Sequence, residues 1–147
     1  MNGSSLSGDF SYLRIASRQA KFGETFLNLG IIPGDGGAWF MQRQIGYQRA
    51  FELTLSGRVI DAQEALAYGI VLEVAEPDVL MKAAYEHAGR IAAQPPKATR
   101  LTKRLMKMAP DMELKGFLDV CAVFQGMSHN EPEHLEAVQQ MLDRMKK

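Results

Sequence analysis

The stretch AKFGETFLNLGIIPGDGG, residues 20–37, divides the chain into two parts with different sequence patterns. Short apolar runs that suit β-strands lie before it and in its first half, at residues 12–16, 20–22 and 26–29. Its second half, residues 30–37, holds four glycines and one proline, which predicts a tight turn. Nearly all of the sequence after this turn has a helical pattern. We therefore expect a few short strands, a glycine-rich turn and then helices.

The helices after the turn are marked by their own start and stop residues. Gly46, Gly57 and Gly69 are expected to end three successive helices at residues 38–44, 47–55 and 61–68. Asp61 and Glu64 form a capping-box pair, and residues 70–74 form a further β-rich run. Later helices are expected at residues 78–93, from Pro96 onward, at 112–127, and after an Asn130 cap supported by Glu133.

Composition excludes several functional classes. Seventeen basic residues balance seventeen acidic ones, so charge predicts neither a nucleic acid nor an acidic membrane as partner. No apolar run approaches the ~20 residues that span a bilayer. Cys121 is the single cysteine, and the three histidines lack ligand spacing, so we expect no disulfide and no metal site. The absence of a signal-peptide pattern at residues 1–8 adds to the expectation of a reduced, cytoplasmic protein.

The expected strands and helices do not suffice to form a stable domain by themselves. Two or three short strands do not make a stable sheet unless further strands or a packed face support them. The later helices carry wide apolar stripes, such as Leu114, Phe117, Cys121 and Phe124, that need to be covered. We infer that strands are missing upstream or that another chain covers these faces.

An ordered series of motifs resembles the enoyl-CoA hydratase/isomerase (crotonase) family over residues 12–147. The motifs are residues 20–37, Ile45-Gly46, Leu55-Ser-Gly57, Asp61-Ala-Gln-Glu-Ala65, Tyr68-Gly-Ile-Val71 and Ile91-Ala-Ala93. The resemblance implies an α/β fold of the ClpP/crotonase type, built as a spiral of ββα turns with a helical C-terminal trimerisation region. It also implies that the family's N-terminal half is missing, so that the fold and the active site are truncated.

Three regions follow from this resemblance. Residues 1–11 are expected to be disordered, a tag or a truncated junction. Residues 12–77 would be the end of the crotonase spiral core with its glycine-rich active-site turn, and residues 78–147 the helical C-terminal region. The expected partners are an acyl-CoA substrate and further copies of the chain, as a trimer or dimer of trimers. Coenzyme A enters as the thioester substrate, and no separate cofactor or metal is expected.

The candidate catalytic residues are the two carboxylates of the glycine-rich stretch, Asp35 and Glu24. By resemblance, a hydratase carries a glutamate at the position of Phe26, whose phenyl ring cannot transfer a proton. Asp35 lies near a position where some family members carry a catalytic aspartate, but Asp before Gly-Gly and a helix is also a natural N-cap. For Glu24, on an expected loop, a solvated or salt-bridged role is favoured over a catalytic one.

Other residues are assigned to binding by the same resemblance. Substrate contact is assigned to Phe26, Ile32, Pro33, Gly34 and Trp39, although for Trp39 core packing is favoured over lining of an acyl pocket. Coenzyme A contact is assigned to Arg144 and Lys147, although fraying of a terminal helix is the default expectation there. The favoured function is hydration of a 2-enoyl-CoA thioester, aided by stabilisation of an enolate-like oxyanion. The alternatives are a double-bond isomerase or other crotonase reaction, a non-catalytic oligomerisation fragment, and an unrelated helical binding module.

Overall fold

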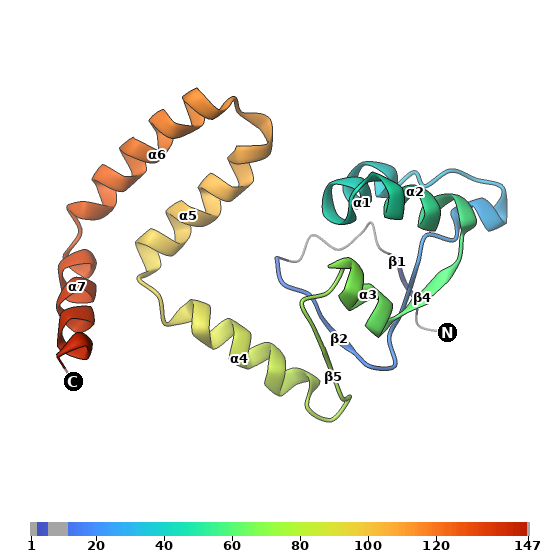
Figure 1. Cartoon of the computed structure of the whole chain (residues 1–147), viewed down its shortest axis with the longest axis horizontal. Coiled ribbons are helices and arrows are strands. Elements are labelled where there is room, and N and C mark those ends of the chain that lie inside the picture. The colour runs from blue at the N-terminus through green and yellow to red at the C-terminus, as the bar shows by residue number, and fades with distance from the viewer. Residues whose placement is uncertain (1–2, 6–11, 147) are drawn as a thin grey trace. The chain divides into compact units, whose positions relative to one another are not determined.

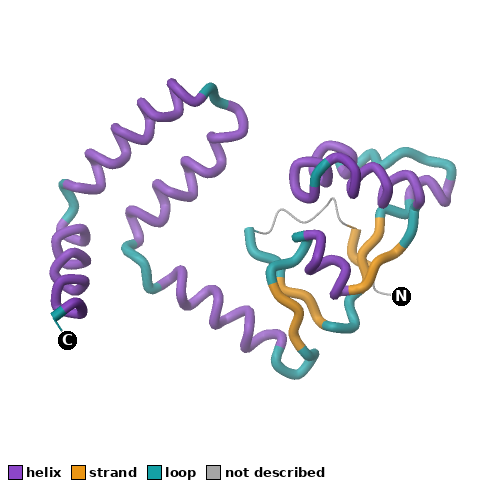
Figure 2. The backbone as a smooth tube through the Cα atoms, in the orientation of Figure 1, coloured by secondary structure: helices purple, strands orange, loops and turns teal. Residues whose placement is uncertain are grey.

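The computed structural model describes residues 3–5 and 12–146 and divides the chain into two compact units, Met1–Tyr85 and Glu86–Lys147 (Figure 1). The segment expected to be a tag, a junction or disordered, residues 1–11, lies outside the described residues except for Gly3–Ser5. Those three residues form strand β1. The α/β class, with a few short strands followed by helices, is confirmed (Figure 2).

The first unit holds two small sheets. Parallel pairing of β1 with β3 (Lys21–Gly23) and antiparallel pairing of β3 with β4 (Val59–Asp61) make a three-stranded sheet in the order β1-β3-β4. Phe22 lies opposite Ile60 in this register, and both side chains are buried. The second sheet pairs β2 (Ile15–Ser17) with β5 (Glu73–Ala75) in parallel. Strands β2 and β5 each begin three residues later than the apolar runs, residues 12–16 and 70–74, that predicted them.

The run at residues 26–29 was expected to suit a strand, and this prediction is wrong. Phe26–Leu29 forms a 3-10 helix, η1, which ends at Gly30 with φ of +72°. The Asn28 amide donates to the carbonyl of Gly57, 2.9 Å away, so a distant glycine fixes the turn. A positive φ of +61° at Gly57 and the nearby Asn28 side chain leave no room for a Cβ there.

The three helices of the first unit follow the predicted punctuation. They are α1 (Gly37–Ile45), α2 (Tyr47–Ser56) and α3 (Ala62–Tyr68), and Gly46, Gly57 and Gly69 lie at their C-caps. The Asp61 side chain accepts a hydrogen bond from the Glu64 amide at 2.9 Å, which confirms the predicted N-cap. Helices α1 and α2 pack against each other beside the β1-β3-β4 sheet (Figure 1).

A compact apolar core holds the first unit together. Its least exposed members come from α2, α3 and β4, with Leu53, Ala62 and Ala65 fully buried and Ile60 1% exposed. Met41 and Ile45 of α1 and Phe22 of β3 complete one continuous cluster with them. The glycine-rich turn, residues 30–37, therefore lies between β3 and α1, which are both anchored in this core.

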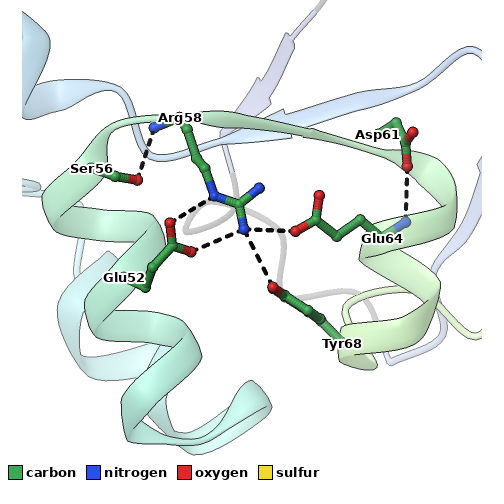
Figure 3. Close-up of polar contacts among 6 residues, drawn as sticks. All are labelled: Glu52, Ser56, Arg58, Asp61, Glu64 and Tyr68. Atoms are coloured by element: carbon green, nitrogen blue, oxygen red, sulfur yellow. Dashed lines mark hydrogen bonds and ion pairs between the residues drawn. The ribbon is translucent and has the colours of Figure 1, made fainter.

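Arg58 joins α2 to α3 through a polar network on the edge of this core (Figure 3). Its guanidinium donates to Glu52 at 2.7 and 2.9 Å, to Glu64 at 2.6 Å and to the Tyr68 hydroxyl at 3.3 Å. The hydrogen bonds from Arg58 hold the pKa of the Glu52 and Glu64 carboxyls below their usual values. Glu64 therefore does not complete the predicted capping box, because its carboxylate is turned toward Arg58.

The later helices have a different character. They are α4 (Leu80–Ala92), α5 (Pro96–Met108), α6 (Leu114–His129) and α7 (Pro132–Met145), with a short 3-10 turn, η2, at Ala109–Asp111. None of the described residues in α4 to α7 is buried, and Leu114 and Leu135 are each 69% exposed. No described helix combines the length and apolarity needed to cross a bilayer. These apolar faces still need a cover, as the sequence predicted.

The expected Asn130 cap of the last helix is wrong. Asn130 ends α6 instead, and its side-chain amide donates to the Gly126 carbonyl at 2.8 Å. Glu131 takes the N-cap position of α7, and Pro132 is its first residue. Glu133 accepts a hydrogen bond from the Lys97 amide at 3.4 Å, so it supports the start of α5 rather than a capping pair with Asn130.

Candidate active site around the glycine-rich turn

The glycine-rich turn, residues 30–37, runs from the end of η1 to the first residue of α1. Gly30 and Gly36 adopt the left-handed conformation, with φ of +72° and +88°, so the chain reverses sharply at both ends. Between them Ile32 is 77% exposed, and an added Cβ at Gly34 would meet nothing within 4 Å. The backbone of the turn thus depends on glycine at both ends, and the middle of the turn is exposed to solvent.

Asp35 lies at the end of the turn, and its side chain is tied to the start of α1. Its Oδ1 accepts a hydrogen bond from the Gly37 amide at 3.0 Å. Gly36 is the N-cap residue, so Asp35 stands one position earlier than a true N-cap and still satisfies a first-turn amide. Asp35 itself remains exposed, so its carboxylate is both oriented by the backbone and accessible to a substrate.

Glu24 is buried, with only 1% of its surface exposed. Of the solvated or salt-bridged role favoured for it, the solvated part is therefore wrong. A Cβ built on Gly37 would lie 2.9 Å from both of its carboxylate oxygens, so the carboxylate is packed directly against that glycine. The structure thus brings the two candidate carboxylates to the same residue: Asp35 accepts from the amide of Gly37, and Glu24 packs against its Cα.

The residues assigned to substrate contact are spread along the same segment. Phe26 is half-buried in η1, and its carbonyl accepts a hydrogen bond from the Ile31 amide at 3.3 Å. Pro33 is half-buried, whereas Gly34 is exposed. Trp39 is 49% exposed, with the Arg43 guanidinium 3.7 Å from the centre of its ring. Trp39 is therefore not a core residue, and the core-packing role favoured for it is wrong.

The residues assigned to coenzyme A lie at the other end of the chain. Arg144 is exposed in the last turn of α7, and Lys147 lies outside the described residues. Within residues 3–5 and 12–146, no group of three or more His, Cys, Asp or Glu side chains could hold a metal ion. The candidate site described by the structure therefore consists of the first-unit residues between β3 and α1.

Sequence reasoning missed two residues that hold this segment in place. Asn28 anchors η1 to Gly57, and Arg58, the next residue, ties α2 to α3. Both interactions join segments that are far apart along the chain or belong to different elements, so no helical or strand periodicity signals them. The one available sign was Ser-Gly-Arg at residues 56–58, where a glycine C-cap lies two residues before a strand.

This arrangement suits proton transfer at an apolar ligand. An accessible carboxylate with a fixed orientation can give or take a proton, and exposed apolar groups such as Ile32 and Trp39 can contact an aliphatic or aromatic group. Burial of Glu24 leaves Asp35 as the carboxylate of the pair that a ligand can reach.

Comparison with known proteins shows which enzyme family the chain resembles. Residues 6–146 match the family described as Enoyl-CoA hydratase/isomerase. A short-chain-enoyl-CoA hydratase of Clostridioides difficile is 33% identical over 86% of this chain and 81% of its own length. A 1,2-epoxyphenylacetyl-CoA isomerase of Escherichia coli K12 is 32% identical over 93% of this chain and 51% of its own.

Solved structures show the same fold. The crystal structure of an enoyl-CoA hydratase from Bacillus anthracis matches with a TM-score of 0.85 and 35% identity, over 90% of this chain and 52% of that one. The crotonase-like fold predicted from the sequence is thereby confirmed. Several relatives are about twice as long as the matched part, so the chain spans about half of their length.

Proposed function

Since this chain belongs to the enoyl-CoA hydratase/isomerase family, we propose that it is the part of an acyl-CoA enzyme that carries the acid/base carboxylate. The favoured reaction is hydration of a 2-enoyl-CoA thioester. The observation that carries the proposal is the geometry of Asp35, an exposed carboxylate held at 3.0 Å by the Gly37 amide.

Hydration adds the oxygen of water to C3 of the enoyl group and a proton to C2. Asp35 would take a proton from the attacking water as its oxygen bonds to C3, while electrons move toward the thioester oxygen. Asp35 then gives that proton to C2, where the electrons from the thioester oxygen form the new C–H bond, so one water has been added and the carboxylate is restored. Hydrogen-bond donors aimed at the thioester oxygen would stabilise its transient negative charge. Phe26, Ile32, Pro33, Gly34 and Trp39 would contact the acyl group, and Arg144 and Lys147 the coenzyme A moiety.

Isomerisation of a double bond is the second candidate, and Phe26 is the observation that favours it. Hydration by two acids needs a second proton-transfer group, and the phenyl ring of Phe26 supplies none. Moving a double bond needs only one carboxylate, which takes a proton from one carbon and returns it to another. Relatives named as isomerases, including a trans-2-decenoyl-[acyl-carrier-protein] isomerase of Streptococcus mutans, support keeping this candidate.

A substrate pair in deuterated water tests the proposal and separates the two reactions. The protein is given a 2-enoyl thioester and, separately, a 3-enoyl thioester, and the products are followed by mass spectrometry. Addition of one water to the 2-enoyl substrate supports hydration, whereas conversion of the 3-enoyl substrate to its 2-enoyl isomer with no gain of water supports isomerisation. Neither binding nor turnover of either thioester would refute the enzyme proposal for this chain and favour a non-catalytic oligomerisation fragment.

Replacement of the carboxylate tests the role of Asp35. We expect Asp35→Asn to lower kcat by about 10²–10⁴-fold, since that is the usual contribution of a positioned acid or base. KM should change little, because the amide keeps the shape of the side chain. Asp119→Asn, on the exposed surface of α6, is the matched control and should retain full activity. Equal activity of Asp35→Asn and Asp119→Asn would remove Asp35 from the mechanism.

We also propose that copies of the chain assemble, as a trimer or a dimer of trimers. Support comes from α4 to α7, whose described residues include none that is buried although many are apolar. The cytoplasm is the compartment we expect, since the single Cys121 offers no disulfide framework. Native mass spectrometry of the 16.3 kDa chain would test the assembly, and a monomer at micromolar concentration would contradict it.

A further inference from the structure

We propose that Glu24 is a positioning residue, whose buried carboxylate seats the first residue of α1 and thereby fixes the orientation of Asp35. The proposal rests on the proposed function only in taking Asp35 as the acid/base group. Glu24 itself would not exchange protons with the substrate, because its side chain has almost no exposed surface.

The burial of Glu24 is exceptional in this chain. Among the residues that the structure describes, it is the only polar or charged side chain in the buried class. Burying a carboxylate is unfavourable unless nearby groups stabilise it, so such a residue needs a specific environment. The first turn of α1 offers one, because the N-terminal end of a helix carries partial positive charge. Glu24 follows β3 directly, so the carboxylate is held by an element of the β1-β3-β4 sheet.

Gly37 is the residue on which this carboxylate rests. An added Cβ at that position would stand 2.9 Å from both carboxylate oxygens and 3.0 Å from the carboxyl carbon. Gly34, in the same turn, has nothing within 4 Å of such a Cβ. The requirement for glycine at position 37 therefore arises from close approach of Glu24, and no comparable requirement acts at position 34.

The same residue links Glu24 to Asp35. The amide of Gly37 donates to Asp35 at 3.0 Å, so a shift of the Gly37 backbone also moves the donor that orients Asp35. Gly34, just before Asp35, has open space around it, whereas Gly37, two residues after Asp35, packs against the Glu24 carboxylate. By packing against Gly37, Glu24 thus fixes the backbone that orients Asp35, the catalytic candidate.

Hydrogen exchange tests the contact without any need for activity. We expect Glu24→Ala to speed amide exchange in the first turn of α1, residues 37–40, by at least tenfold, while amides of α3 keep their wild-type rates. Glu24→Gln preserves the shape of the side chain and should restore much of the protection. Wild-type exchange at residues 37–40 in Glu24→Ala would overturn the proposal.

Substitution at Gly37 tests the same contact from the other side. Gly37→Ala should lower Tm because its methyl group meets the carboxylate, and adding Glu24→Ala should raise Tm above that of Gly37→Ala alone. Gly34→Ala is the matched control and should leave Tm unchanged, since its methyl group enters open space. A double variant less stable than both single variants would contradict the contact.

Turnover separates positioning of Asp35 from a general structural role. Glu24→Ala should lower kcat at least tenfold with little change in KM, and Glu24→Gln should recover part of that loss. In an Asp35→Asn background the further loss caused by Glu24→Ala should disappear, because the group that it orients is already absent. An undiminished loss in that background would overturn positioning through Asp35. Inactivity of the wild-type chain would contradict the proposed function, while the exchange and Tm results would still decide on the contact with Gly37.

Discussion

Replacement of Leu53 by alanine gives a direct measure of how much the first-unit core stabilises the protein. Leu53 is fully buried in α2, and its side chain belongs to the cluster that includes Ile60 and Ala65. The change removes three carbon atoms and leaves a cavity, which costs about 2–5 kcal/mol when the surroundings relax only partly. Domains have a total stability of about 5–15 kcal/mol, so a large share of it would be lost.

Leu55, two residues later on the same helix, is the matched control. It is 53% exposed, so Leu55→Ala removes the same atoms from a site that is about half solvated. Full burial of a leucine stabilises by about 1.5–3 kcal/mol relative to exposure, so half burial predicts a loss of about 1 kcal/mol. The two variants should therefore differ by at least about 1 kcal/mol, with Leu53→Ala the less stable.

Urea denaturation followed by circular dichroism measures both free energies of unfolding. The measurement is made at two protein concentrations, since an assembly would make the apparent stability depend on concentration. Equal losses for Leu53→Ala and Leu55→Ala would refute the reasoning, because burial in the first unit would then not distinguish the two sites. A loss well below 1 kcal/mol for Leu53→Ala would show that the core described here does not limit stability.

Three further predictions concern contacts outside that core. Gly57→Ala should lower stability by about 2 kcal/mol or more, because φ is positive and the added Cβ would overlap the Asn28 side chain. Urea denaturation checks this, and Gly116→Ala, whose Cβ would make only an ordinary contact with Met112, is the control. Arg58→Met should lower Tm most above about pH 4.5, since Arg58 lowers the pKa of the Glu52 and Glu64 carboxyls. The stabilisation by Arg58 is present above the usual carboxyl pKa and is lost as pH falls through the lowered values. A Tm difference between wild type and variant that grew on acidification would contradict this prediction. Glu131→Gln should speed amide exchange in the first turn of α7, because it weakens the ion pair with Lys97; exchange that is unchanged at low salt would argue against a role for that pair.

Much of the local structure of this chain could be predicted from its sequence. Glycines at 46, 57 and 69 end helices because a left-handed or otherwise unusual backbone is accessible to glycine without a Cβ clash. Asp61 begins α3 because its side chain reaches the amide three residues on. The glycine-rich turn and the placement of Asp35 at the start of α1 were likewise predictable. All of these features depend on atoms within a few residues of one another.

Other features were misjudged where a distant residue decides the outcome. The β-compatible run at residues 26–29 is a 3-10 helix, in which Asn28 donates to the carbonyl of Gly57, 29 residues away. Asn130 had two helices that it could cap, and it ended α6 while Glu133 supported α5. In each case a residue with a strong local preference met a competing partner that its own neighbourhood did not reveal.

The sequence by itself determined the family, the order of strands, turn and helices, and the pair of carboxylates at the glycine-rich stretch. Only the tertiary structure decided that Glu24 is buried, that it meets Asp35 at Gly37, and that Arg58 joins two helices. The physical reason is the range of the interactions involved. Backbone preference and capping act over one helical turn, whereas burial and ion pairing depend on which distant segments the folded core brings together.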